Sequence, residues 1–180
     1  MQSGRTVLII PGLGNSGPQH WQTLWEARKP EYRRVQQNDW EHPRCRDWTR
    51  NIDAAISSAE SPVVLVAHSM GCIAAVHWAL SSGANGLVAA AFLVAPPDVE
   101  ADTIPAGPTG FAPCPLSRLP FRSLVVASTS DPFASLERAK FFATAWGSDL
   151  LVLESAGHIN AVSGFGPWPE GGRLLEKLMQ

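Results

Sequence analysis

Ser69 is the residue whose sequence setting points most directly to chemistry. It follows a short apolar run, Val63–Ala67, and precedes a stretch with helical character, so the serine falls at a sharp turn between a strand and a helix. The segment Ala67–Gly71 (A-H-S-M-G) is similar to the G-x-S-x-G pattern of a nucleophile elbow, in which a strained turn exposes the serine hydroxyl. The N-terminus of the following helix favours negative charge, as an oxyanion requires. Ser69 is therefore a candidate nucleophile for acyl transfer.

The neighbours of Ser69 fit this interpretation with one departure. The positions two before and two after the serine must be small, because the strand and the helix pass close together there. Gly71 meets this requirement, whereas Ala67 replaces the usual glycine with one additional methyl group. The alternative is that Ser69 only caps a helix, which is a common role for serine. The segment alone leaves both interpretations open, so the rest of the chain must decide.

A nucleophilic serine needs a general base, and two histidines follow Ser69 in the chain, His77 and His158. His77 falls about two turns into the helix after the serine, far from the turn itself. His158 follows a predicted strand, residues 149–154, in a short polar loop at the edge of the sheet where such a base belongs. We therefore predict that His158 is the base.

The base in turn needs an acid that orients it, and Asp131 is the first candidate. It follows a predicted strand, residues 123–128, and lies between the serine and the histidine in chain order. An Asp-Pro pair also commonly starts a turn, and Asp131 can fill both roles. The weaker candidates lie in a proline-rich loop, at the start of a strand or too close to the histidine in sequence: Asp98 (the second choice), Asp102, Asp149 and Glu154.

An oxyanion hole needs two backbone N–H groups. Met70, the residue after the nucleophile, is expected to supply one of them. The glycine-rich loop Pro11–Gly17 follows the first predicted strand, and Leu13 is the candidate donor of the second N–H. A phosphate-binding loop is the alternative for these glycines, but the loop has neither a G-K-[ST] ending nor G-x-G-x-x-G spacing.

Strands and helices are predicted to alternate along the chain, which favours a mostly parallel sheet with helices on both faces. The predicted strands are 5–10, 33–37, 63–67, 88–95, 123–128 and 149–154. The predicted helices are 19–29, 46–59, 71–80, 134–146 and 170–179. Neither a repeat nor a linker divides the sequence, so we expect one α/β domain over residues 1–180.

Residues 96–120 interrupt this alternation because they contain seven prolines. The segment leaves the C-terminal end of a predicted strand, where open α/β sheets bind their ligands. We interpret it as a pocket wall or a short lid. A surface loop without a role is the alternative.

Composition argues against several other classes of protein. The net charge is −2 and no basic run is present, so a nucleic-acid surface is not indicated. The three cysteines have no C-x-x-C spacing, which indicates neither a disulfide scaffold nor a zinc site and favours a reducing cytoplasm. We expect neither a signal peptide nor a membrane span, because no apolar run approaches the roughly 20 residues that a span requires.

Together these residues resemble the small serine hydrolases of the α/β-hydrolase fold, in the family of predicted esterases that includes retinoblastoma-binding protein nine. The resemblance covers nearly the whole chain. Its segments, of which the first is the most specific, are 11–21 (PGLGNSGPQHW), 67–71 (AHSMG), 130–133 (SDPF) and 157–160 (GHIN), with shorter similarity at 39–40 and 119–121. The resemblance implies a compact six-stranded core with a minimal lid and a triad of Ser69, Asp131 and His158. Ala67 departs from the G-x-S-x-G pattern at its first position.

We therefore predict a cytoplasmic serine hydrolase that cleaves a small ester, or as second choice an amide, through an acyl-enzyme intermediate. Leu13 and Met70 would bind the oxyanion, and neither a metal nor an organic cofactor is required. From their positions, Trp21 and Phe133 are expected to line the substrate pocket, together with the proline-rich loop. The short chain leaves little room for a cap, so we expect an open site that takes small substrates.

The alternative is a different class of protein, an interaction module that binds a protein partner and whose hydrolase site is vestigial. The L-x-C-x-E pattern associated with pocket-protein binding does not occur in the sequence. The serine, aspartate and histidine also follow one another in the required order, which favours the enzyme. A haloalkane dehalogenase needs an aspartate nucleophile, and Ser69 excludes it.

Overall fold

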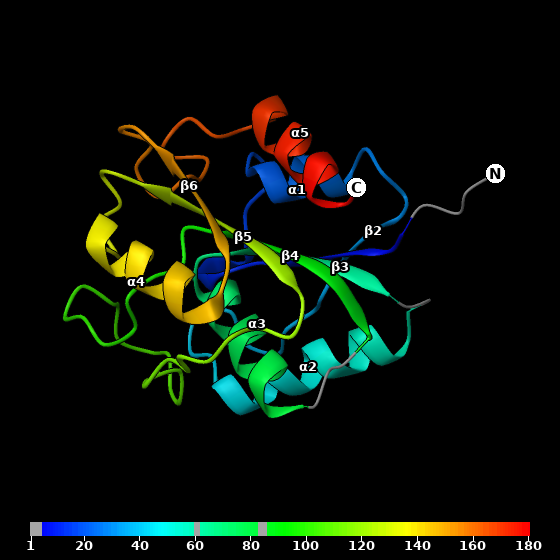
Figure 1. The fold of residues 1–180 in the computed structure, drawn as a ribbon, viewed down its shortest axis with the longest axis horizontal. Helices are drawn as coiled ribbons and strands as arrows, with labels where there is room; N and C mark the ends of the chain where they lie inside the picture. The colour runs from blue at the N-terminus through cyan, green and yellow to red at the C-terminus, as the bar shows by residue number, and fades with distance from the viewer. Residues whose placement is uncertain (1–4, 60–61, 83–85) are drawn as a thin grey trace.

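The computed structural model describes residues 5–59, 62–82 and 86–180, and these contain six strands that form a single sheet. All neighbouring strands are parallel, in the order β2-β1-β3-β4-β5-β6 (Figure 1). The strands are β1 (Val7–Ile10), β2 (Tyr32–Arg34), β3 (Val63–His68), β4 (Val88–Val94), β5 (Arg122–Ser128) and β6 (Asp149–Leu153). The helices are α1 (Trp21–Glu26), α2 (Cys45–Ser57), α3 (Met70–Ser81), α4 (Leu136–Trp146) and α5 (Pro169–Leu178), and a 3-10 turn, η1, spans Leu13–Asn15.

The predicted order of elements is confirmed. Both β3 and β4 are continuous apolar runs because each is covered on both faces, as parallel strands usually are. Local capping accounts for small shifts at the helix ends. The helix predicted from residue 134 begins at Leu136, because the Ser135 hydroxyl accepts a hydrogen bond from the Arg138 N–H (3.1 Å) and caps the helix.

Helices cover both faces of the sheet, which confirms the predicted three-layer arrangement. Figure 1 shows α1 and α5 on one face and α2, α3 and α4 on the other. The larger apolar core lies under α2, α3 and α4. The smaller core, under α1 and α5, is rich in indole rings, and Trp25 stacks on Trp168 with 5.9 Å between ring centroids.

The aromatic face also links α1 to the segment after β6. The indole N–H of Trp21 donates to the carbonyl of Ile159 (2.9 Å), and that of Trp25 donates to the carbonyl of Pro167 (2.8 Å). Buried indoles need such partners for their N–H groups. These bonds fix the loop that carries His158 relative to the first helix of the chain.

The proline-rich segment 96–120 contains no helix or strand, as predicted. Its second half packs on the helices beneath it: the carbonyl of Phe111 accepts a hydrogen bond from His77 (2.9 Å), and that of Pro115 accepts one from the Trp146 indole (2.9 Å). Its first half is held by Arg138, which pairs with Asp98 and Glu100. The segment is therefore anchored to α3 and α4 along its length.

Within the described residues, no helix combines the length and the apolar character needed to cross a lipid bilayer. The N-terminal residues 1–4, where we expect no signal peptide, lie outside the described part of the chain.

Candidate active site

Ser69 occupies a strained turn between β3 and α3. Its backbone has φ 54° and ψ −128°, a conformation that residues other than glycine seldom adopt. Its N–H donates to the carbonyl of Val94 (2.9 Å), which holds the turn on the neighbouring strand. The side chain is thereby directed away from the sheet and is only partly buried.

Two glycines let neighbouring backbone approach this turn. A Cβ on Gly71 would overlap the carbonyl oxygens of Ile10 and Pro11, so this position accepts no side chain without a shift of the backbone. A Cβ on Gly12 would lie 2.8 Å from the Cβ of Ser69. The departure at Ala67 is harmless by contrast, because its methyl group is fully buried in the well-paired strand β3.

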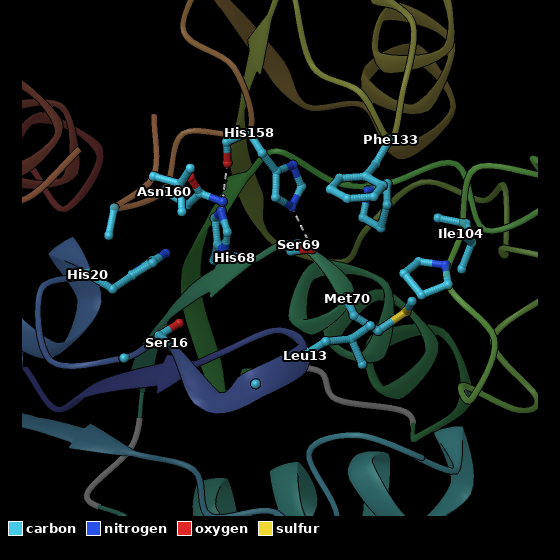
Figure 2. Close-up of a pocket in the computed structure, with 16 residues that line it drawn as sticks. Leu13, Ser16, His20, His68, Ser69, Met70, Ile104, Phe133, His158 and Asn160 are labelled. Carbon is cyan, nitrogen blue, oxygen red and sulfur yellow. Dashed lines mark hydrogen bonds between the residues drawn. The ribbon is translucent and has the colours of Figure 1, made fainter. Parts of the chain in front are cut away.

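Figure 2 shows Ser69 beside His158 at the C-terminal edge of the sheet. The Nε2 atom of His158 lies 2.8 Å from the Ser69 Oγ, and its Nδ1 atom lies 3.0 Å from each carboxylate oxygen of Asp131. A carboxylate can only accept, so Nδ1 carries the proton and Nε2 presents a lone pair to the serine hydroxyl. The structure thus brings together the three residues that the sequence selected, on the loops after β3, β5 and β6.

The two loops that carry the histidine and the aspartate are joined by serine hydroxyls. Ser128 Oγ accepts from the Ala156 N–H and Ser130 Oγ accepts from the Gly157 N–H, both at 3.0 Å. The carboxylate side chain of Asp131 is almost fully buried, with 4 % of it exposed. Burial behind these bonds keeps water from competing for the carboxylate.

The weaker candidates lie elsewhere. His77 bonds to the proline-rich segment and is remote from the serine turn. Asp98 pairs with Arg138, and Glu154 accepts a hydrogen bond from Thr129 at the surface. Asp102 is exposed in the proline-rich segment, and Asp149 is exposed at the opposite end of the sheet from His158.

A second histidine, His68, supports the first. Its Nε2 atom lies 2.9 Å from the backbone carbonyl of His158, and since a carbonyl only accepts, this nitrogen carries a proton. Burial holds the pKa of His68 well below its usual range, and the nearby rings of His20 and His158 lower it further. His68 is therefore a neutral donor that ties the loop carrying His158 to the end of β3. Sequence reasoning missed it, because the position before the serine is unspecified in the motif.

A third histidine, His20, extends this row. Its ring meets that of His68 edge-on with 4.6 Å between centroids, and the His68 and His158 centroids are 4.9 Å apart. Its Nδ1 accepts a hydrogen bond from the Gln22 N–H (3.2 Å) and caps α1. Burial lowers the pKa of His20 to about 4, and the Arg34 guanidinium contributes. The sequence signal was its place in the first turn of the helix predicted over residues 19–29, next to Trp21, whereas the observed helix begins one residue after His20, at Trp21.

The loop between β1 and α1 faces the serine from the opposite side. Within this loop, the N–H groups of Gly14 and Asn15 donate to the carbonyls of Trp40 (3.2 Å) and Gly12 (3.3 Å). Across residues 5–59, 62–82 and 86–180, no hydrogen bond uses the N–H of Leu13 or that of Met70. Both residues line the cavity beside Ser69, as their predicted roles require.

Arg34 at the end of β2 fixes that loop. Its guanidinium donates to the backbone carbonyl of Asn15 (2.6 Å) and to the Thr23 hydroxyl (2.7 Å), and it pairs with Glu26 (2.8 Å). A planar guanidinium can satisfy several acceptors in one geometry, which suits a residue that must lock a turn. The second strand, predicted over residues 33–37 and observed at Tyr32–Arg34, thus holds the loop beside Ser69 through its last residue.

A cavity of about 350 Å³ opens over Ser69. Phe133 lines it, as predicted, and meets the His158 ring edge-on with 4.7 Å between centroids. The proline-rich segment contributes Pro97, Ile104 and Pro105, in agreement with its interpretation as a pocket wall.

The expectation for Trp21 requires correction. Its side chain is fully buried in the aromatic core under α1 and α5 and does not reach the cavity. The cavity is instead reached by the preceding residue, His20. Adjacent side chains at the N-terminus of a helix point in different directions. A prediction that is wrong by one position therefore names a core residue in place of a pocket residue.

Metal-binding clusters and reactive thiols are two other kinds of site that could carry chemistry. In the described residues, no three His, Cys, Asp or Glu side chains converge as a metal site would require. The three cysteines are free and buried. Burial raises the pKa of Cys45 to about 11 and that of Cys114 to about 12, and raises the pKa of Cys72 well above its usual range.

The fold and this cluster define a serine hydrolase, and comparison with known proteins agrees. Residues 7–177 match the serine hydrolase family, and the chain belongs to that family. A YdeN-like hydrolase from Pectobacterium atrosepticum is 34 % identical, with a TM-score of 0.86 over 97 % of this chain and 90 % of its own. The ydeN gene product of Bacillus subtilis is 19 % identical, with a TM-score of 0.72 over 97 % of this chain and 98 % of its own.

More distant structures share the fold alone. Carboxylesterase CesB from Bacillus subtilis is 13 % identical, with a TM-score of 0.64 over 98 % of this chain and 84 % of its own. No curated protein matches this chain significantly. The predicted relationship to small serine hydrolases of the α/β-hydrolase fold is confirmed.

Proposed function

We propose that this protein is an esterase that works through a covalent acyl-enzyme, with Ser69 as nucleophile, His158 as general base and Asp131 as the acid that orients the base. The observation that carries the proposal is the continuous hydrogen-bonded row from the Ser69 Oγ through both nitrogens of His158 to the Asp131 carboxylate. Such a row removes the serine proton as the oxygen attacks, which a hydroxyl alone does poorly at neutral pH.

The reaction divides into two halves. In the first, Ser69 Oγ forms a bond to the ester carbonyl carbon while its proton moves to His158 Nε2. The tetrahedral intermediate collapses, the carbon–oxygen bond to the alcohol breaks, and the alcohol takes that proton. In the second, water gives a proton to His158 and attacks the acyl carbon, which releases the carboxylic acid and returns the proton to Ser69.

The N–H groups of Leu13 and Met70 complete the proposed site as the oxyanion hole. Their support is that both residues line the cavity beside Ser69 while neither N–H is used within the described protein. Donors that are already in place where negative charge develops need no reorganisation during the reaction. Removing one such donor commonly costs about 10² to 10³ in turnover.

The size of the cavity supports a small substrate. A volume of about 350 Å³ lies near the lower end of ligand pockets and has room for a short acyl or alcohol chain. We propose an ester before an amide, because an alkoxide is the easier leaving group. The three free, buried cysteines support action in a reducing compartment such as the cytoplasm, and we propose that residues 1–180 act as one domain.

Labelling with a fluorophosphonate probe tests the proposal. The natural protein is expected to be labelled rapidly, because an activated serine attacks the phosphorus of the probe, displaces fluoride and becomes phosphonylated. Ser69→Ala and His158→Ala are expected to remain unlabelled, whereas His42→Ala, which changes an exposed histidine outside the cavity, is expected to label like the natural protein. A folded natural protein that is not labelled, or a labelled Ser69→Ala protein, would refute the proposal and make binding of a protein partner the leading function.

A further inference from the structure

The cavity has two unlike sides. Figure 2 shows Ser16, His20, His68 and Asn160 on one side of Ser69, and the apolar side chains of Met70, Ile104 and Phe133 on the other. A substrate whose carbonyl carbon lies at Ser69 therefore extends one group towards polar atoms and another towards apolar ones.

His20 supplies a buried donor on the polar side. Its Nδ1 accepts the hydrogen bond from the Gln22 N–H, so that nitrogen carries no proton. The neutral ring must then carry its proton on Nε2. Nε2 is buried, and among the described residues it has no hydrogen-bond partner. Only 5 % of His20 is exposed, yet the residue forms part of the cavity wall.

The neighbours of His20 are already engaged. Ser16 Oγ donates to the Gln22 side chain (2.7 Å), and the Asn160 side-chain oxygen accepts from Ser163 (3.0 Å). The His68 Nε2 proton points to the His158 carbonyl. A buried donor without a partner is uncommon and costly in a folded protein. An acceptor that enters the cavity would supply the missing bond.

The lack of charged side chains in the described cavity wall indicates which kind of acceptor it would bind. Among the described residues that line it there is no Lys, Arg, Asp or Glu. His20 is also neutral near pH 7, because burial and Arg34 lower its pKa to about 4. A carboxylate entering here would lose its hydration without gaining a cation, whereas a hydroxyl, ether or carbonyl oxygen would lose little.

We propose that His20 is a specificity-determining residue whose Nε2–H donates to an uncharged oxygen on the substrate, beside the scissile ester. The preferred substrates are then short esters that carry a second, neutral oxygen on one side of the ester group and an apolar group on the other. This inference rests on the proposed esterase function and names the substrate class of the same site.

Isosteric ester pairs test the inference. Ethyl methoxyacetate and ethyl butyrate differ by one ether oxygen in the acyl chain, and 2-methoxyethyl acetate and butyl acetate differ in the same way in the alcohol. For each pair, the ratio of kcat/KM is measured in the natural protein and in His20→Asn. Asparagine retains an acceptor for the Gln22 N–H at the start of α1 but is too short to place a donor at Nε2. Comparing ratios between proteins cancels the intrinsic reactivity of each ester.

In one of the two pairs, the preference for the oxygenated ester is expected to fall about tenfold in His20→Asn, the size of one neutral hydrogen bond. The other pair serves as the internal control. His20→Gln, whose amide reaches further, is expected to restore part of the preference, and the exposed His42→Asn is expected to leave both ratios unchanged.

A second measurement retains His20 and so does not depend on the variant folding. In Ser69→Ala protein with labelled histidines, the His20 Nε2–H resonance is expected to move when the oxygenated ester binds and to stay when its methylene counterpart binds. The inference would be overturned if the kcat/KM ratios of His20→Asn stayed within twofold of the natural values in both pairs. It would also be overturned if the His20 Nε2–H resonance responded equally to the oxygenated ester and to its methylene counterpart. In either case, fluorophosphonate labelling of the natural protein would still support the esterase. Absence of both hydrolysis and labelling in the natural protein would instead refute the proposed function, and this inference with it.

Discussion

The two sides of the candidate active site are held in place by different forces. On the serine side, backbone is packed directly on backbone: Gly12 and Gly71 lie where any Cβ would collide, and Ser69 itself has a positive φ. On the histidine side, side-chain hydrogen bonds hold the loops, from His158 to Asp131 and from His68 to the His158 carbonyl.

This difference predicts two kinds of sensitivity. Close packing of backbone cannot be relaxed by a small amount, so a single methyl group on the serine side displaces the reacting atoms. Hydrogen bonds can be removed one at a time, and some depend on protonation, so the histidine side should respond to isosteric substitutions and to pH.

The largest effect is expected at the carboxylate. Asp131→Asn retains the shape of the side chain but offers an amide in place of the carboxylate, so the His158 tautomer with a proton on Nδ1 loses its support. We expect kcat for a short ester to fall about 10⁴-fold with the fold intact. Asp149→Asn, which changes an exposed carboxylate at the opposite end of the sheet, is the matched control and should stay near the natural rate. A loss below tenfold in Asp131→Asn would show that another group orients the histidine.

A smaller effect is expected on the serine side. The methyl group of Gly12→Ala would meet the Ser69 Cβ at 2.8 Å and push the loop that carries Leu13, a proposed oxyanion donor, away from Ser69. We expect kcat to fall about 10²- to 10³-fold, the size of one lost oxyanion donor. Gly17→Ala is the comparison from the same loop, because its Cβ would have no atom within 4 Å, and it should retain more of the natural kcat. Equal losses in the two variants would contradict the steric explanation.

The smallest effect is expected on stability, through the pH dependence of the two buried histidines His20 and His68. Unfolded histidine binds a proton near pH 6.5, whereas burial lowers the pKa of folded His20 to about 4 and that of His68 in the same direction. The unfolded state therefore takes up more protons as the pH falls from 6.5 towards 4, and stability decreases in that window. His20 alone should reduce the free energy of unfolding by about 2 kcal/mol between pH 7.5 and 5.

Urea unfolding at these two pH values measures this loss. His20→Asn removes one of the two buried imidazoles, so its stability should depend less on pH than that of the natural protein. An equal pH dependence in both proteins would mean that His20 is charged, or reaches water, in the folded state.

Much of the fold was readable from the sequence because buried parallel strands are continuous apolar runs. Residues 63–67 and Val88–Val94 are such runs, and the polar residues that follow strands mark the C-terminal edge of the sheet. The candidates Ser69, Asp131 and His158 could be selected by their places after strands and by chain order, and the structure brings their side chains into contact.

What the sequence could not provide is the rotation of each side chain about its element. His20 and Trp21 are adjacent, yet one reaches the cavity and the other fills the core, which depends on how α1 packs against Trp168. His68 is likewise defined by a long-range contact with the backbone of a loop ninety positions later. Neither propensity nor motif spacing encodes such contacts, so the roles of His20 and His68 were missed.

The all-parallel sheet also has a consequence for synthesis on the ribosome. Chains emerge from the N-terminus, so β1, β3 and the glycines that pack around Ser69 are available long before β6 and His158. Trp168 and α5, which close the aromatic core, emerge later still. A nascent chain can therefore contain the complete turn around Ser69 without His158, and under the proposed mechanism the serine would become reactive only after the last fifth of the polypeptide has folded onto the rest.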